Sequence, residues 1–245
     1  MIYYYILYMK TLGYDAIMWG GTGWNMLWSF GVAQFFMDTG LKSPIKVGVV
    51  SGGCMTGLVF CGAANQQLGI VQCEQLYNSG DLYFNNKFRP RFREWFEFFA
   101  KQDCMEILKE YDFYSTYTKI PIFKIVKDNI HSSRKEFMDK LVAGCHVPFL
   151  FGTNIPMFYK GNYVVDTLDF RKTWWEFPGN NTLVISPSEK SSANMIGGEL
   201  SVLTTIGIRG NLTNKDLFLM GYKTAAEWYG NIKRNEAWAS KENWR

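Results

Sequence analysis

The stretch Trp19-Gly20-Gly21-Thr22-Gly23-Trp24 decides the fold that this sequence predicts, together with Val47-Gly48-Val49-Val50-Ser51-Gly52-Gly53 about one helix later. In each stretch a buried apolar run stops at glycines and restarts as a helix. Glycine lacks the Cβ atom that restricts tight or left-handed backbone, so the chain can turn sharply there with its N–H groups facing outward. Two such turns predict two neighbouring strand–turn–helix units that together form a site.

Ser51 stands at the apex of the second turn. A serine on a sharp strand-to-helix turn is how α/β hydrolases present a nucleophile above the sheet. The trailing glycine of that pattern is present as Gly53, whereas Val49 replaces the leading one. Tight packing of a helix on a sheet is the alternative interpretation of small residues here. The first glycine turn favours the interpretation of Ser51 as a nucleophile. Acyl transfer needs backbone N–H donors for the oxyanion, and Gly21-Thr22-Gly23 can supply them.

Length and composition indicate an ordinary globular protein. A chain of 245 residues is most simply one domain, residues 1–245, and it is long enough to bury a substantial core. Its 47% hydrophobic and 20% charged residues are typical of soluble proteins. The net charge of +4 is modest, and one basic cluster, Lys87-Phe88-Arg89-Pro90-Arg91-Phe92-Arg93, either touches phosphates or begins a solvated helix. We expect no nucleic-acid partner.

The cysteines and the first residues bear on localisation. Five cysteines without metal-type spacing favour a reducing compartment. The apolar start, Met1–Met9, has no basic leader or cleavage site and is too short to span a bilayer. Its composition favours a strand, with a membrane-surface anchor as the alternative. We therefore expect an intracellular protein, either cytoplasmic or peripheral to a membrane.

Periodicity predicts alternating strands and helices. The expected strands are 14–19, 45–50, 119–126, 160–165 and 181–187, and the expected helices are 26–40, 53–64, several within 68–117, one capped by Ser132 or Ser133, and one over 217–225. A continuous apolar strand such as 45–50 is typical of a parallel sheet covered on both faces. The pattern predicts a three-layer α/β/α sandwich with a mainly parallel central sheet.

A serine nucleophile also needs a base. The chain has two histidines, His131 in a polar connector and His146 beside a proline, and both positions favour structural or exposed roles. Asp166 ends the apolar strand that begins near Asn162. We expect it at the same sheet edge as the turn of a parallel neighbour, although an aspartate after a strand is more often a turn residue.

These stretches together resemble the patatin-like phospholipases, and within them the adiponutrin and adipose triglyceride lipase branch. The matching segments are Gly21-Thr22-Gly23-Trp24-Asn25-Met26 with Gly31-Val32-Ala33, then Ser51-Gly52-Gly53-Cys54-Met55-Thr56, Cys145-His146-Val147-Pro148 and Lys160–Asp166. The resemblance spans residues 14–229. It implies a patatin-like fold and a Ser-Asp dyad in which Ser51 is the nucleophile, Asp166 the base and Gly21, Thr22 and Gly23 the oxyanion hole.

The sequence departs from this family at three places. Val49 and Met26 replace glycines of the two motifs, and Thr167-Leu168 replaces the two small residues that normally follow the aspartate. Bulk there either narrows the site and changes the substrate, or marks an inactive relative.

The resemblance implies hydrolysis of carboxylic esters in lipids, of the phospholipase A or lipase type. The alternatives are a catalytically impaired lipid-binding relative and an acyltransferase that uses the same dyad. The expected partner is a lipid substrate at a membrane or lipid-droplet surface, where Trp174-Trp175-Glu176-Phe177 is either an anchor or part of the core. We expect no metal ion and no other cofactor, and the oligomeric state stays open.

Overall fold

The structure of the chain is a computed structural model. It describes residues 13–41, 46–79, 88–129, 132–148, 156–167, 181–205 and 211–242. The predictions made for Met1–Met9, Lys87, His131, Leu168 and Trp174–Phe177 concern residues outside these ranges.

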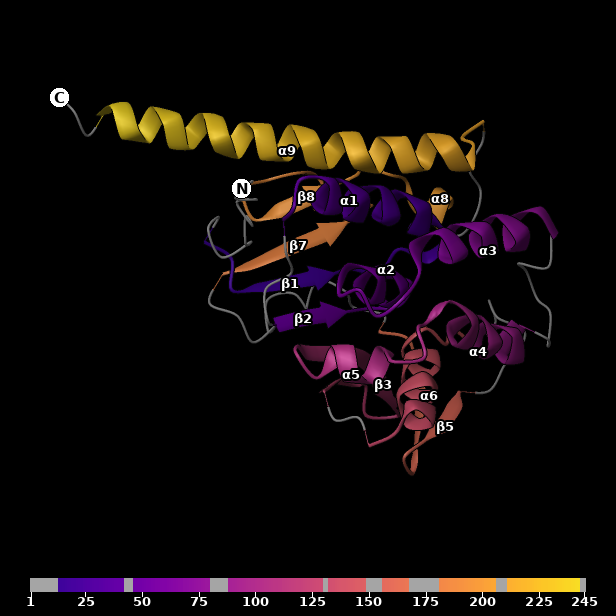
Figure 1. The fold of residues 1–245 in the computed structure, drawn as a ribbon. Helices are drawn as coiled ribbons and strands as arrows, with labels where there is room; N and C mark the ends of the chain where they lie inside the picture. The colour runs from indigo at the N-terminus through magenta and orange to yellow at the C-terminus, as the bar shows by residue number, and fades with distance from the viewer. Residues whose placement is uncertain are drawn as a thin grey trace.

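A central sheet organises the described part of the chain (Figure 1). Its strands are β1 (Ala16–Trp19), β2 (Lys46–Val49), β3 (Asp112–Ile120), β4 (Lys124–Asp128), β5 (Met157–Tyr159), β6 (Asn162–Val165), β7 (Thr182–Ser186) and β8 (Met195–Gly197). They follow the order β5-β6-β3-β2-β1-β7-β8, with β4 paired to β3. Every pairing among β3, β2, β1, β7 and β8 is parallel, and the pairings of β4, β5 and β6 are antiparallel.

Helices flank this sheet, which confirms the predicted α/β/α sandwich. They are α1 (Met26–Asp38), α2 (Gly53–Phe60), α3 (Gln66–Ser79), α4 (Phe88–Phe99), α5 (Cys104–Leu108), α6 (Arg134–Gly144), α8 (Val202–Thr205) and α9 (Asn214–Glu242), with a short 3-10 helix, η2 (Gly23–Asn25), before α1. In Figure 1, α9 runs beside α1 along one side of the molecule, and α4, α5, α6 and β5 lie toward the other side.

The core lies where the first two strand–turn–helix units pack together. Every residue of β1 and of α2 is buried, as expected for a central parallel strand and for a helix that is apolar all round. The Trp19 ring makes edge contacts with Phe36 of α1 and Phe60 of α2. This aromatic cluster fixes both helices on the end of β1, beside the first glycine turn.

Two glycines bring α1 and α9 into direct backbone contact. A Cβ atom on Gly31 would lie 2.0 Å from the carbonyl oxygen of Phe218, and one on Gly221 would lie 1.8 Å from that of Trp28. Any side chain at either position would push the two helices apart. The helix predicted at 217–225 is therefore part of a longer helix that is closely packed on α1.

Helix α6 begins where the sequence predicts. Ser133 is its N-cap, and the Ser133 hydroxyl oxygen accepts a hydrogen bond of 3.2 Å from the Glu136 N–H. Phe137, Leu141 and Val142 are buried on one side of the helix, as the sequence spacing indicated. Helix α6 contacts β3, β5 and β6 and so covers the antiparallel part of the sheet.

Two predictions about the middle of the chain are wrong. Residues 112–117 form part of β3 and not of a helix, because this run is rich in aromatic and β-branched residues that pack well in a sheet. The single strand predicted at 119–126 is the end of β3, a turn at 121–123 and the start of β4. Phe123 reverses the chain there with φ of 49°, a conformation for which glycine or asparagine is the usual sequence signal.

Candidate active site

Ser51 occupies a strained turn directly after β2. Its φ is 51°, in the left-handed region that residues other than glycine rarely adopt. The turn is held by hydrogen bonds from the Val50 N–H to the Trp19 carbonyl, 3.0 Å, and from the Gly53 N–H to the Val50 carbonyl, 2.9 Å. Helix α2 begins at Gly53, so the strand, turn and helix context expected of a nucleophile elbow is present.

The two glycine turns touch each other. A Cβ atom on Gly52 would lie 2.3 Å from the Thr22 hydroxyl oxygen, and one on Gly53 would lie 2.4 Å from the Trp19 carbonyl oxygen. Both positions therefore need glycine. Within the described ranges, the backbone N–H groups of Gly21, Thr22 and Gly23 donate no hydrogen bond. As far as the described residues go, the turn beside Ser51 therefore has N–H donors to spare, as an oxyanion site requires.

The structure brings Ser51 and Asp166 together. The Ser51 hydroxyl donates a hydrogen bond to Asp166 Oδ2, and both side chains are largely buried, with 8% and 2% of their surface exposed. The expectation that a parallel strand delivers Asp166 is wrong, because β6 is antiparallel to β3. On β3, strand β6 pairs with residues 118–120, beyond the part of β3 that pairs with β2, and it runs back toward the Ser51 turn.

Burial determines the protonation of Asp166. It raises the pKa of this carboxyl from 3.8 to about 7, against the opposing effect of the hydrogen bond from Ser51. Asp166 Oδ1 has no hydrogen-bond partner among the described residues. A buried carboxyl with a pKa near neutrality can take up and release a proton at physiological pH, which suits a general base.

Two adjacent residues connect the backbones of this pair. The Cys145 thiol donates a hydrogen bond of 3.0 Å to the Ser51 carbonyl, and the His146 carbonyl accepts one of 2.7 Å from the Asp166 N–H. Burial raises the pKa of the Cys145 thiol well above its ordinary value, so it stays protonated and can donate. The sequence predicts a structural or exposed role for His146, which is buried. It does not indicate the contact of Cys145, since a thiol-to-carbonyl contact has no sequence signal.

The replaced glycines have identifiable surroundings. The Val49 side chain is buried against α2, where a Cβ atom on Gly57 would lie 2.4 Å from Val49 Cγ1. Thr167 is buried, and its hydroxyl donates to the Thr116 hydroxyl, which donates to the Val49 carbonyl, both at 3.2 Å. The bulk of Val49 thus points into the core, and Thr167 ties the end of β6 to β2.

Met26 lies beside the turn that carries Ser51. A Cβ atom on Gly52 would lie 3.1 Å from Met26 Cγ. The methionine side chain therefore packs against the residue that follows Ser51.

The remaining sequence candidates have other surroundings. Arg93, the described side chain of the basic cluster, forms an ion pair with Asp139 of α6. All five cysteines are buried, and none of them forms a disulfide bond. Among the described residues, no group of three His, Cys, Asp or Glu side chains is arranged to hold a metal ion, and no helix is both long and apolar enough to cross a bilayer.

Fold and site together give a three-layer α/β/α sandwich in which Ser51 and Asp166 meet beside a glycine turn. A solved structure with this fold is VipD from Legionella pneumophila, which matches with a TM-score of 0.52 at 8% sequence identity, over 89% of this chain and 67% of that chain. No family model and no curated protein matches the sequence. At this identity the likeness shows the fold alone, and the adiponutrin and adipose triglyceride lipase branch stays a prediction.

Proposed function

We propose that this chain is a lipid acyl hydrolase that cleaves carboxylic esters through Ser51 and Asp166. The hydrogen bond between their side chains carries the proposal, because it joins a hydroxyl on a strained turn to a carboxyl whose pKa is near neutrality. The fold shared with VipD is compatible with this chemistry, and the oxyanion donors proposed are the N–H groups of Gly21, Thr22 and Gly23.

The proposed reaction has two halves. Asp166 accepts the Ser51 proton while Ser51 Oγ attacks the acyl carbonyl, and the negative charge on the carbonyl oxygen is stabilised by the backbone donors. The protonated Asp166 then gives its proton to the departing alcohol, which leaves an acyl-serine. Water, deprotonated by Asp166, attacks this ester, and Ser51 recovers its proton as the fatty acid leaves.

Labelling with a fluorophosphonate probe tests the nucleophile without requiring the right lipid. We expect the purified protein to be labelled, Ser51→Ala to be unlabelled, and Asp166→Asn to react about 10²–10⁴-fold more slowly, the usual contribution of a general base. Ser115→Ala is the matched control, because Ser115 is also buried and its hydroxyl has no partner in the described part of the chain. Labelling that persists in Ser51→Ala would contradict the assignment.

A lipid panel then defines the reaction. Incubation with a phospholipid and with a triacylglycerol, each with a radioactive acyl chain, should release free fatty acid in the wild type and not in Ser51→Ala. Transfer of the acyl chain to an added alcohol or lysolipid, without net release, would indicate the acyltransferase alternative. A folded protein that is not labelled and releases nothing would support the impaired relative, with Met26 as the first residue to revert to glycine.

A further inference from the structure

Apolar side chains are exposed where the antiparallel part of the sheet ends. Ile122 and Phe123, in the turn between β3 and β4, are 68% and 67% exposed. Phe158 of β5 and Tyr163 of β6 are 61% and 52% exposed, and the centroids of their rings are 5.4 Å apart. Tyr163 pairs directly with Ile120, which leads into the turn. We call these five residues the hairpin-tip surface.

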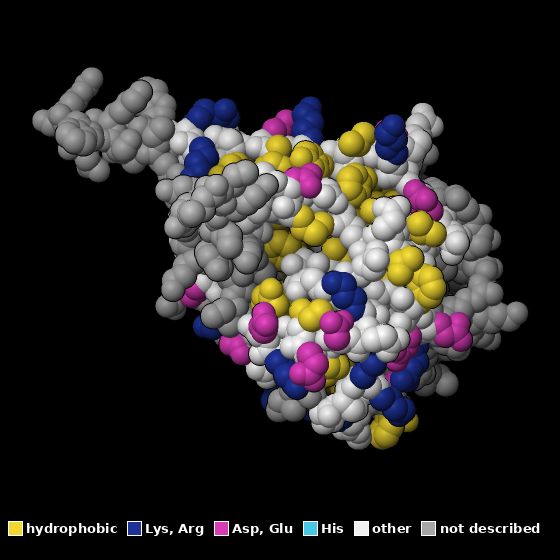
Figure 2. Space-filling model, viewed as in Figure 1, with side chains coloured by type: hydrophobic (Ala, Val, Ile, Leu, Met, Phe, Trp, Pro, Cys, Tyr) yellow, Lys and Arg dark blue, Asp and Glu magenta, His cyan; other side chains and the backbone are white. Residues whose placement is uncertain are grey.

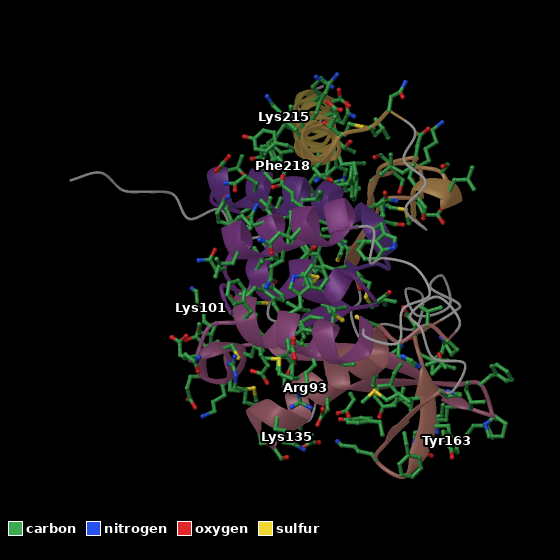
Figure 3. The ribbon with its side chains drawn as sticks, turned by 90° about the vertical axis from the view of Figure 1, so that its right-hand side faces the viewer. Arg93, Lys101, Lys135, Tyr163, Lys215 and Phe218 are labelled. Atoms are coloured by element: carbon green, nitrogen blue, oxygen red, sulfur yellow. The ribbon has the colours of Figure 1, made fainter. Side chains whose placement is uncertain are left out.

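This surface lies at the margin of the molecule. Figure 3 shows Tyr163 at the lower margin of the molecule, on the opposite side from Lys215 and Phe218 of α9. Helix α6 covers one face of β3, β5 and β6. Pairing register places Phe158, Tyr163 and Ile120 side by side across three strands, so their side chains share one face. The result is a continuous apolar row that ends in the turn.

The conformation of Phe123 shows that the fold keeps an aromatic residue at this tip at a cost. Its φ of 49° is unfavourable for a bulky side chain, and most of the ring contacts solvent. Glycine or asparagine would fit the turn better. Strain and exposure together at one residue point to a role outside the folded core.

Charges at the base of the turn complement an anionic surface. Lys119 and Lys124 lie directly opposite each other in the β3–β4 pairing, and like charges in such positions are destabilising. Neither lysine forms an ion pair with a carboxylate of the described residues. Figure 2 shows basic and acidic side chains intermixed over the lower part of this face of the molecule. Anionic headgroups around the turn would relieve the repulsion.

The tip also stands in a useful position relative to the Ser51–Asp166 pair. Val165, next to Asp166, pairs with Thr118, and Ile122 follows four residues later in the chain. Because the chain turns at 121–123, this separation is at most roughly 13 Å, the length of four residues at the rise of an extended strand. A protein that rests on a bilayer by its tip would therefore hold the pair above the headgroups and not on the far side of the molecule.

We infer that the hairpin-tip surface docks on anionic lipid bilayers, with Ile122 and Phe123 entering the apolar boundary and Lys119 and Lys124 contacting lipid phosphates. This inference rests on the proposed function, since it places the site of ester hydrolysis at the surface that contains its substrate. Apolar side chains flanked by lysines are the combination that holds peripheral proteins at such interfaces.

Co-sedimentation with vesicles tests the docking. One set of vesicles is phosphatidylcholine alone and the other contains phosphatidylserine as well. The tip variant is Ile122→Ser with Phe123→Asn, and its control is Phe98→Ser, a 58% exposed aromatic on α4. We expect the tip variant to bind both kinds of vesicle about tenfold or more weakly, because it lacks two apolar side chains that the bilayer would bury. The control should bind as the wild type does.

The lysines are tested by their charge dependence. Lys119→Gln with Lys124→Gln should lose the preference for phosphatidylserine and the sensitivity to salt, whereas Lys101→Gln with Lys215→Gln removes the same charge elsewhere and should keep both. Equal binding by the tip variant and the wild type, or no binding by the wild type, would overturn the inference. Light scattering gives a further test. The inference would also be overturned if the wild type were a dimer, the tip variant were a monomer, and both bound vesicles equally.

The two proposals fail separately. Fluorophosphonate labelling of the wild type is measured without vesicles and reports only the nucleophile. If the wild type is labelled and the tip variant binds vesicles as well as the wild type does, the docking proposal alone is overturned. If the wild type is not labelled but binds vesicles more tightly than the tip variant does, the hydrolase proposal alone is overturned.

Discussion

The thiol of Cys145 donates a hydrogen bond of 3.0 Å to the carbonyl oxygen of Ser51, on the turn where Ser51 has a positive φ. Its neighbour His146 accepts the Asp166 N–H, so one short segment after α6 fixes the backbones of both members of the pair. A strained turn persists only when its surroundings hold it in place. Cys145 is therefore a positioning residue for Ser51.

Replacing Cys145 with alanine should loosen the Ser51 turn. Loss of one hydrogen bond to a buried carbonyl should lower the free energy of unfolding by about 1 kcal/mol and slow fluorophosphonate labelling by about tenfold. The matched control is Cys61→Ala, which removes a buried thiol on the other end of α2 and should lose stability without slower labelling. Equal labelling rates in the two variants would exclude positioning by Cys145.

The pH dependence of labelling should follow Asp166. With a pKa of about 7, this carboxyl is protonated and unable to accept the Ser51 proton in mild acid, and it becomes a base as the pH rises. We expect the labelling rate to increase from pH 5, to reach half of its maximum near pH 7, and to level off above pH 8. A rate that is flat across this range would mean that Asp166 is not the base.

The same raised pKa predicts a pH-dependent gain in stability for Asp166→Asn. In the unfolded chain Asp166 ionises near pH 4, whereas in the folded protein it holds its proton up to about pH 7. Between these values the folded state binds more protons, so the group makes the wild type less stable as the pH rises, by at most about 1.4 kcal/mol per pH unit. Denaturant unfolding of both proteins should show their difference growing from pH 4 to 7 and then staying constant.

The packing of Val49 on Gly57 can be tested by a double-mutant cycle. Gly57→Ala places a methyl group 2.4 Å from Val49 Cγ1, and we expect a loss of about 1–3 kcal/mol, as in other overpacked cores. Val49→Ala should restore most of that loss in the double variant, because it removes the clashing atom. Additive losses, measured by denaturant unfolding, would show that the two side chains do not compete for this space.

Most of the fold, and the two candidate residues that the structure brings together, were predictable because they depend on local pattern. Local signals of this kind include the glycine turns, the apolar runs before them and the Ser133 cap, each of which acts within a few residues. The structure has β2 at such an apolar run, α2 after the glycine turn and α6 after the Ser133 cap. Asp166 was found by resemblance and by its position at a strand end. Its delivery by an antiparallel strand was not predicted, because pairing direction depends on distant partners such as Ile120.

What the sequence did not reveal depends on contacts between segments far apart in the chain. Cys145 and Ser51 are 94 residues apart, and Thr167 and Thr116 are 51 apart, and neither contact has a spacing rule. The turn at Phe123 was missed for another reason. Phe123 has a positive φ at the position where a glycine usually indicates such a turn in the sequence.

The reciprocal contact of Gly31 and Gly221 sets an order for events during protein synthesis. Helix α1, whose first residue packs beside the Ser51 turn, depends on α9 for the partner that covers its glycine face, and α9 lies more than 170 residues later in the chain. A nascent chain that has been made only as far as α2 therefore has the proposed nucleophile but lacks the helix that covers α1. The activity proposed here should appear only once α9 has been made and has packed on α1.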